Sequence, residues 1–183
     1  GMSSTFFEFQ KEIIYNRARG YTKNLYRQFQ NASLSDLSIK FPGGGIISTS
    51  TDLLRFGISF LEGKLISKTL IDTMLTPTRL KNGRSINYGL GFSTGVDVKG
   101  ITYFYHSGNG TGFSSHFILY PSEGIVAVHL TNCIDRSLGN PAIDLVNIFR
   151  GHFLPVPKIP ASDYLLGITL AHGIDSALVE LKL

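Results

Sequence analysis

The chain has 183 residues, a length that suits one domain with room for a small appendage. Hydrophobic residues make up 43% of it and charged residues 16%, so the sequence is globular and not disordered or collagen-like. The net charge of +4 comes from scattered basic residues, which argues against a nucleic-acid-binding surface. A single cysteine, Cys133, excludes an internal disulfide. No apolar run is long enough for a membrane span.

The first forty residues predict loops and a short hairpin. Arg19-Gly20-Tyr21 is typical of a turn or a short hairpin, and residues 31–41 have the composition of a loop. The stretch Phe41-Pro42-Gly43-Gly44-Gly45 ends this part of the chain, because proline and glycine interrupt regular structure.

Two helices are expected next. Thr49 followed by Asp52 has the spacing of a capping box, with Asp in place of the usual Glu, and apolar residues then repeat at helical spacing. Gly63 is the expected stop of this helix. A second, short helix is predicted to begin at Ser67 and to end before Pro77.

From Tyr88 onward the sequence has the pattern of strands. Strands are predicted at 88–94, 101–106, 114–120 and 125–131. The last two are joined by Pro121-Ser122-Glu123-Gly124, a four-residue turn with glycine last. Four consecutive strands with short links indicate an antiparallel meander. We therefore predict an α+β fold, in which a sheet of about four antiparallel strands has helices before and after it.

The end of the chain predicts one more helix, a linker and a tail. Residues 141–153 have apolar residues at helical spacing. Three prolines between 155 and 160 then predict a stiff linker, and two short helical patterns follow it. We accordingly divide the chain into a domain at 1–155 and a proline-rich linker with a short helical tail at 156–183.

One general catalytic pattern occurs in the first predicted strand. Gly91-Phe92-Ser93-Thr94-Gly95 fits G-x-S-x-G, the nucleophile elbow of α/β-hydrolases. Such an elbow lies between a strand and a helix, whereas the residues that follow here predict a turn and a strand. A plain strand end is therefore favoured over a nucleophilic Ser93.

The other reactive side chains give weaker signals. His116 and His129 lie on neighbouring predicted strands, but no third ligand stands at a suggestive spacing, so no metal site is predicted. Cys133 follows a strand and has no nearby base, which favours a buried thiol. His152 and His172 lie in helical segments and are expected at the surface.

The segment His106-Ser107-Gly108-Asn109 is more informative. A strand rich in aromatic residues is predicted to end there in a histidine, a hydroxyl and a glycine. Glycine lets a ligand or another backbone approach closely, and free N–H groups suit an acyl-transfer site. Taken alone, the same residues also fit a structural turn.

The order of the segments resembles a known family. In chain order they are Gly1-Met2-Ser3-Ser4-Thr5, Arg17-Ala18-Arg19-Gly20-Tyr21, Phe41-Pro42-Gly43-Gly44-Gly45, Tyr88-Gly89-Leu90-Gly91-Phe92, His106-Ser107-Gly108, Gly112-Phe113-Ser114-Ser115 and Leu130-Thr131-Asn132. Together they resemble the C-terminal part of the β-lactamase-related serine hydrolases, which include class C β-lactamases and penicillin-binding-protein-like peptidases and esterases. The resemblance implies a serine acylated by an amide, ester or lactam and then hydrolysed, with no metal or cofactor.

That family builds its active site from three boxes, and His106-Ser107-Gly108 matches the third, in which Lys or His is followed by Ser or Thr and then Gly. In that role His106 would offer a polar or cationic group to the substrate and Gly108 would clear space for it. The backbone N–H of Asn109 would be one oxyanion-hole donor. We call His106 to Asn109 the third box below.

The other two boxes of the family are absent from these 183 residues. No lysine has a serine three residues before it, so there is no Ser-x-x-Lys box, and no asparagine has a tyrosine two residues before it. The family's N-terminal helix and its first two sheet strands would precede residue 1. The chain is therefore expected to be about half of a hydrolase, an incomplete β-lactamase-like fold that is inactive alone.

Three functional interpretations stay open. The first is the C-terminal half of a serine hydrolase whose intact relatives act on small-molecule or peptide-like acyl substrates. The second is a non-catalytic interaction module that binds a partner through its sheet edge or its tail. The third is an α/β-hydrolase that uses Ser93. Because intact relatives are commonly exported, the resemblance implies a periplasmic or extracellular protein.

The resemblance also has a consequence for self-association. In the family, the strand that matches 125–131 lies inside the sheet, beside a strand from the N-terminal segment. Without that neighbour it is a long apolar edge with no proline or lysine, and such an edge recruits another strand. We therefore predict a homodimer through strand 125–131, unless residues 5–9 or the tail cover it.

Overall fold

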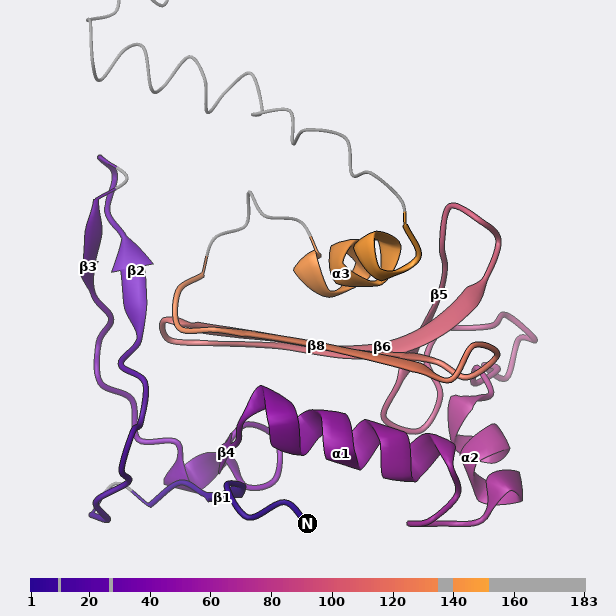
Figure 1. The fold of residues 1–183 in the computed structure, drawn as a ribbon, viewed down its shortest axis with the longest axis horizontal. Coiled ribbons are helices and arrows are strands. Elements are labelled where there is room, and N and C mark those ends of the chain that lie inside the picture. The colour runs from indigo at the N-terminus through magenta and orange to yellow at the C-terminus, as the bar shows by residue number, and fades with distance from the viewer. Residues whose placement is uncertain (10, 27, 135–139, 152–183) are drawn as a thin grey trace, which may run out of the picture.

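A four-stranded antiparallel sheet organises the part of the chain that the computed structural model describes, residues 1–9, 11–26, 28–134 and 140–151. Its strands, in spatial order, are β5 (Ser93–Val96), β6 (Thr102–Gly110), β7 (Phe113–Tyr120) and β8 (Ile125–Thr131). The helices α1 (Ser50–Leu61) and α2 (Lys68–Leu75) lie on one side of the sheet and α3 (Pro141–Phe149) on the other (Figure 1). The predicted α+β fold with an antiparallel meander is confirmed.

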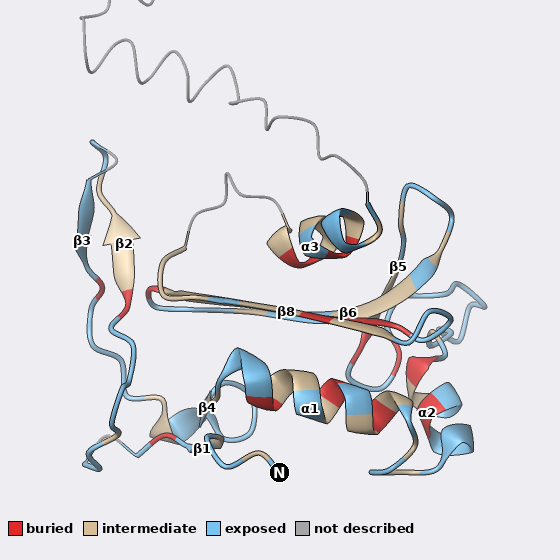
Figure 2. Ribbon diagram, viewed as in Figure 1, coloured by how far each residue is buried: buried red, intermediate tan, exposed pale blue. Residues whose placement is uncertain are grey.

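The alternation of side chains along β7 gives the sheet two separate cores. Figure 2 shows buried residues in the helices on both sides of the sheet. Leu119 packs on the side of α1 and α2, where Phe60 and Leu75 are among its buried neighbours. Ile118 and Tyr120 point to the other side and pack with residues of α3. All three β7 residues are completely buried, because β7 has a strand on each side and helices over both faces.

Both N-terminal helices begin where the sequence predicts. The Thr49 side chain caps α1 by accepting a hydrogen bond from the Asp52 backbone N–H, and Ser67 caps α2 in the same way through the N–H of Leu70. Gly63 follows α1 with φ of +74°, a left-handed conformation that glycine adopts without strain. The capping box is only half formed, however, because the Asp52 carboxylate binds the N-terminal segment instead of the backbone of Thr49.

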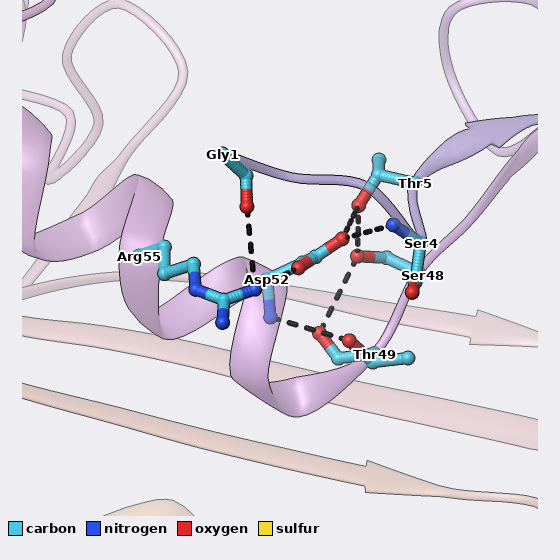
Figure 3. A network of polar contacts seen from close by, with 7 residues as sticks. All are labelled: Gly1, Ser4, Thr5, Ser48, Thr49, Asp52 and Arg55. Carbon is cyan, nitrogen blue, oxygen red and sulfur yellow. Dashed lines mark hydrogen bonds and ion pairs between the residues drawn. The ribbon is translucent and has the colours of Figure 1, made fainter.

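Asp52 ties the start of the chain to α1 (Figure 3). Its carboxylate is 1% exposed and accepts hydrogen bonds from the Ser4 backbone N–H at 2.7 Å, the Thr5 hydroxyl at 2.9 Å and the Arg55 guanidinium at 2.9 Å. Burial by itself favours the neutral acid, but these three donors and the Arg55 charge outweigh it and lower the pKa of Asp52. The ionised carboxylate is thus the form that the fold stabilises.

The N-terminal segment forms two small sheets of its own. β1 (Phe6–Phe7) pairs with β4 (Ile46–Ile47), and β2 (Tyr21–Lys23) pairs with β3 (Phe29–Asn31) in the predicted short hairpin. A single 3-10 turn, Ser38–Lys40, lies in the predicted loop. Since β1 pairs with β4, the segment at 5–9 does not pair with β8.

The first strand predicted for the main sheet starts later than expected. The prediction of a strand at 88–94 is wrong for its first five residues, since β5 begins at Ser93. The preceding segment packs against the end of α2, where the Leu90 N–H donates to the Met74 carbonyl at 2.8 Å. A Cβ on Gly89 would come within 2.2 Å of that carbonyl oxygen, so the close approach requires glycine.

The C-terminal helix is shorter than predicted and is held by a buried ion pair. α3 ends at Phe149, because Gly151 has φ of +77° and closes the helix. The Arg150 guanidinium binds Asp97 at 2.7 Å, also pairs with Glu123, and lies 4.4 Å from the centroid of the Tyr120 ring. Burial, together with the nearby Asp97 charge, raises the pKa of Tyr120 to about 12. These contacts tie α3 to the β5–β6 and β7–β8 turns.

The linker and tail expected at 156–183, with His152 and His172, lie outside the described residues. Among the helices that the structure describes, none has both the length and the apolar character needed to cross a membrane.

We predict that Asp52→Asn lowers the free energy of unfolding at neutral pH, because an amide cannot accept three charge-assisted hydrogen bonds as well as a carboxylate. The folded pKa of Asp52 lies below its ordinary 3.8, so its contribution is present above that value and is lost as the pH falls through the folded pKa. Urea unfolding at neutral and at acidic pH measures both effects. Asp72→Asn, on the exposed side of α2, is the control that should change neither. Equal stability of the Asp52 variant and the parent at neutral pH would contradict the prediction.

We also predict that Gly57→Ala destabilises the protein, although alanine favours a helix by about 1 kcal/mol over glycine. Gly57 lies in α1 against the sheet, where a Cβ would come within 2.5 Å of Val126 Cγ1 and 3.0 Å of Phe117 Cζ. A stiff β-branched side chain cannot swing away, and overpacking of this kind costs about 1–3 kcal/mol. Thermal unfolding of the Gly57→Ala variant should show a net loss of up to about 2 kcal/mol. In a Val126→Ala background the same change should cost clearly less, with only the Phe117 contact left, and an undiminished loss there would refute the steric explanation.

Candidate functional site

The third box lies within a strand and not at the end of one. The predicted strand ended at His106, but β6 continues to Gly110 because its second half pairs with β7. His106 is opposite Phe117 in this ladder, and Gly110 is opposite Phe113. The four residues therefore have an extended backbone whose position is set by the central strand of the sheet.

The outer edge of this half of β6 is open. β5 pairs only with the first part of β6, from Thr102 opposite Val96 to Tyr105 opposite Ser93. From His106 to Gly110, no strand in the described part of the chain pairs with the outer side of β6. A strand edge of this kind leaves backbone N–H and C=O groups for another partner, including an extended peptide-like ligand.

His106 lies on the face of the sheet that carries α1 and α2. Phe104 lies two residues earlier in the strand, points to the same face and packs against the core there. His106 itself is exposed. The Tyr88 and His106 rings meet edge to face, with 6.4 Å between centroids and 67° between the planes. Tyr88 is itself 38% exposed and is held by a bridge to Ser93. The histidine is therefore not a core residue, and both rings are accessible to a ligand.

Gly108 is half-buried and would direct a side chain to the same face. A Cβ at this position would come within 2.9 Å of the Ser115 hydroxyl oxygen on β7. The Ser115 hydroxyl donates a hydrogen bond to the Gly108 carbonyl at 3.5 Å. Gly108 thus keeps the backbone of β6 approachable between the His106 ring and the Ser115 hydroxyl.

Ser107 lies on the opposite face, in a row of polar side chains that crosses three strands. Its hydroxyl oxygen is 3.1 Å from Nδ1 of His116 on β7, and Ser114 Oγ lies 3.5 Å from Nε2 of the same ring. The His116 and His129 rings are neighbours, with centroids 5.9 Å apart. Burial, with the nearby His129 as a second cause, lowers the pKa of His116. Nδ1 of His129 is buried and has no hydrogen-bond partner.

The N-terminal hairpin lies against the end of the sheet where the third box is. The Tyr21 N–H donates to the Asn132 carbonyl at 2.8 Å, and the Asn132 side chain donates to the Arg19 carbonyl at 2.9 Å. Ser35 donates a hydrogen bond to Thr111 in the β6–β7 turn. Figure 1 shows β2 and β3 beyond this end of the sheet. Sequence reasoning gave Asn132 no role, although it belongs to one of the segments that carry the family resemblance.

The alternatives that the sequence left open at Ser93, at the histidine pair and at Cys133 can be compared with the structure. Ser93 is the first residue of β5 and is followed by a strand and a turn, so the nucleophile-elbow interpretation is wrong. Within the described ranges, no group of three or more His, Cys, Asp or Glu side chains is arranged to hold a metal ion. Cys133 is free and half-buried, not fully buried as predicted.

Comparison with known proteins identifies the family to which the chain belongs. The Beta-lactamase family profile matches residues 1–144, and the chain therefore belongs to the β-lactamase family. The serine beta-lactamase-like protein LACTB, mitochondrial, of Bos taurus is 31% identical over 147 residues, which cover 67% of this chain and 26% of that protein. Penicillin-binding protein 4* of Bacillus subtilis is 30% identical over 120 residues, which cover 64% of this chain and 27% of that protein. The chain thus spans about a quarter of the length of these relatives.

Solved structures show the same fold. The octameric penicillin-binding protein homologue from Pyrococcus abyssi superposes with a TM-score of 0.65 over 82% of this chain and 35% of that chain, at 20% identity. The D-amino acid amidase from Ochrobactrum anthropi superposes with a TM-score of 0.61 over 81% of this chain and 50% of that chain, at 19% identity. At these identities the likeness establishes the fold alone. The predicted family and the predicted incomplete β-lactamase-like fold agree with both comparisons.

Proposed function

We propose that these residues supply the substrate-facing part of a β-lactamase-related serine hydrolase. The observation that carries the proposal is the open edge of β6 from His106 to Gly110, which includes the exposed side chain of His106 and, at Gly108, a position without a side chain. An extended acyl substrate can pair with such an edge through backbone hydrogen bonds. Its position is rigid, because the inner side of the same segment is paired with β7.

The third box would contribute binding and electrostatic stabilisation, not the nucleophile. His106 would offer a polar or cationic group to the substrate, and the N–H of Asn109 would be one donor to the oxyanion that forms when the carbonyl is attacked. The nucleophilic serine and its lysine would come from a Ser-x-x-Lys box, which these 183 residues do not contain. Acylation of that serine and hydrolysis of the acyl-enzyme would complete the reaction.

The fold neighbours suggest the class of bond that is cleaved. One neighbour is described as a D-stereospecific amidohydrolase from Streptomyces and another as a D-amino acid amidase. We propose an amide among the acyl substrates on that ground, with esters and lactams as the alternatives. We also propose export to the periplasm or the extracellular space. The competing proposal is a mitochondrial location, which the name of LACTB gives for that relative.

We predict that these 183 residues alone form no covalent acyl-enzyme. Removing the nucleophile from a serine hydrolase site costs a factor on the order of 10⁶ in rate. Incubation with benzylpenicillin and with a fluorophosphonate, followed by intact-mass and peptide mass spectrometry, should detect no stoichiometric adduct. Penicillin-binding protein 4* treated in parallel is the positive control. An adduct on a single serine that is abolished when that serine is replaced by alanine would overturn the prediction. If the serine were Ser93, the nucleophile-elbow interpretation would be correct after all.

A second candidate function is an interaction module that associates through β8. Among the described residues, no strand pairs with the outer side of β8, and β1 is already paired with β4. The strand contains no proline and no lysine. One fold neighbour is described as octameric, which supports self-association as a property of such folds. We propose an antiparallel homodimer through this edge.

We predict that light scattering at increasing protein concentration shows a monomer–dimer equilibrium. Leu130→Lys should weaken the dimer at least about tenfold, because a charged residue on an edge strand discourages pairing. Leu130 is exposed, and its partner in the ladder, Ser115, lies on the interior strand β7. Ser115→Lys is therefore the matched control that should leave the dimer intact, with circular dichroism to confirm folding of both variants. A protein that is monomeric at every concentration would contradict the proposal.

A further inference from the structure

The polar row that crosses β6, β7 and β8 contains groups that the third-box assignment does not use. Ser107 is opposite His116 in the ladder of β6 and β7, and His116 is opposite His129 in the ladder of β7 and β8. Residues that are opposite one another share a face, so the three side chains form one continuous line. This line begins at the open edge of β6 and runs under the sheet, on the side away from His106.

We propose that His116 is a positioning residue for the third box: its Nδ1 accepts the Ser107 hydroxyl proton, so that Ser107 Oγ faces the ligand as a hydrogen-bond acceptor. The proposal rests on the proposed function, because it assumes that the ligand lies along the open edge of β6. It assigns a role to a contact of 3.1 Å between Ser107 Oγ and His116 Nδ1.

The environment of His116 keeps its ring neutral. Burial and the neighbouring His129 both lower its pKa. On β6 it faces the uncharged Ser107. α3, which packs over β7 and β8, carries Asp144 and the C-terminal Arg150, and the Arg150 guanidinium is bound by carboxylates of the two turns. A neutral imidazole has one nitrogen that donates and one that accepts.

The intrinsic preference of the imidazole favours one arrangement of that proton, and both ring contacts can accommodate it. Free histidine prefers its proton on Nε2, and here Nε2 lies 3.5 Å from Ser114 Oγ, which can accept it. Nδ1 then carries the lone pair, and the closer Ser107 hydroxyl can rotate to donate to it. The opposite tautomer would reverse both hydrogen bonds, with Nδ1 donating to Ser107 Oγ and the Ser114 hydroxyl donating to Nε2, so the direction of the Ser107 contact is what the experiment must determine.

This arrangement has a consequence for the ligand. A serine hydroxyl has one proton and two lone pairs, and the proton is used toward His116. Ser107 is exposed and belongs to the open part of β6, so its remaining lone pairs are accessible to a ligand bound there. A ligand with an N–H or ammonium group at this place would gain a hydrogen bond, while a carboxylate would meet an oxygen without a proton. The third box should therefore prefer amide or amino groups there over carboxylates.

The pKa of His116 tests the direction of the hydrogen bond without any ligand. Nitrogen-15 NMR of the full chain labelled in histidine, with the His116 resonances assigned from a His116→Asn variant, follows its titration. If Ser107 donates to Nδ1, it stabilises the neutral ring, and Ser107→Ala should raise the pKa by about 0.5 to 1. Ser115→Ala, which removes a hydroxyl from the adjacent residue on the other face, should leave the pKa unchanged. A fall in the pKa after Ser107→Ala would show that Ser107 accepts, and would overturn the proposal.

Ligand titrations then test the preference. Phenylalanine amide offers ammonium and amide N–H groups, and phenylacetate offers only a carboxylate; binding of each is followed by chemical shift changes on β6. We expect Ser107→Ala and His116→Leu to weaken the amide about three- to tenfold, with His116→Asn closer to the parent because its side-chain oxygen can still accept. Tighter binding of phenylacetate that is lost in Ser107→Ala would overturn the inference and leave the proposed function intact. If neither compound shifts β6, the proposed function and the ligand preference both fail, while the pKa result still decides the direction of the Ser107–His116 hydrogen bond.

Discussion

The register between β6 and β7 is the constraint on which both the core and the candidate site depend. A single ladder runs from Phe104 opposite Leu119 to Gly110 opposite Phe113. Its first half places Leu119 in the core under α1 and α2, and its second half places His106 on that same face. A slip by one residue would exchange the two faces, moving Ser107 to the side of α1 and His106 to the side of α3. The packing of β7 on both faces therefore also fixes which face of the sheet each side chain of the third box occupies.

How well the sequence predicted each element depended on whether the element is determined locally. The bounds of β8 and the first turns of α1 and α2 were predicted correctly, because apolar runs and the hydroxyls of Thr49 and Ser67 act within a few residues. The start of β5 was wrong, because the segment before it is held by the Met74 carbonyl, far away in sequence. β6 was predicted too short, because glycines that suggest a turn are instead paired with β7.

In the candidate site, too, local features could be predicted from the sequence and long-range contacts could not. The third box could be named from its residues, because the family resemblance is carried by a short local motif. Its surroundings could not: the contact of Ser107 with His116 follows from the register of two strands, and the contact of Asn132 with Arg19 joins residues that are 113 positions apart. The partners of buried charges could not be predicted from the sequence either. Asp52 is recognisable as a helix-capping residue, but its hydrogen bonds to Ser4 and Thr5 are not.

The two edges of the main sheet differ in chemistry, and the difference separates the two proposed functions. The open part of β6 contains glycines, a histidine and hydroxyls, so a ligand that pairs there finds polar side chains and little apolar area to bury. Its binding should be weak enough to be reversible, as turnover requires. β8 is almost wholly apolar and has helices packed over both faces, which hold it straight and leave only its edge unsatisfied. An apolar edge of that length favours a lasting strand partner. Catalysis and association can therefore use opposite edges of one sheet without competing for the same surface.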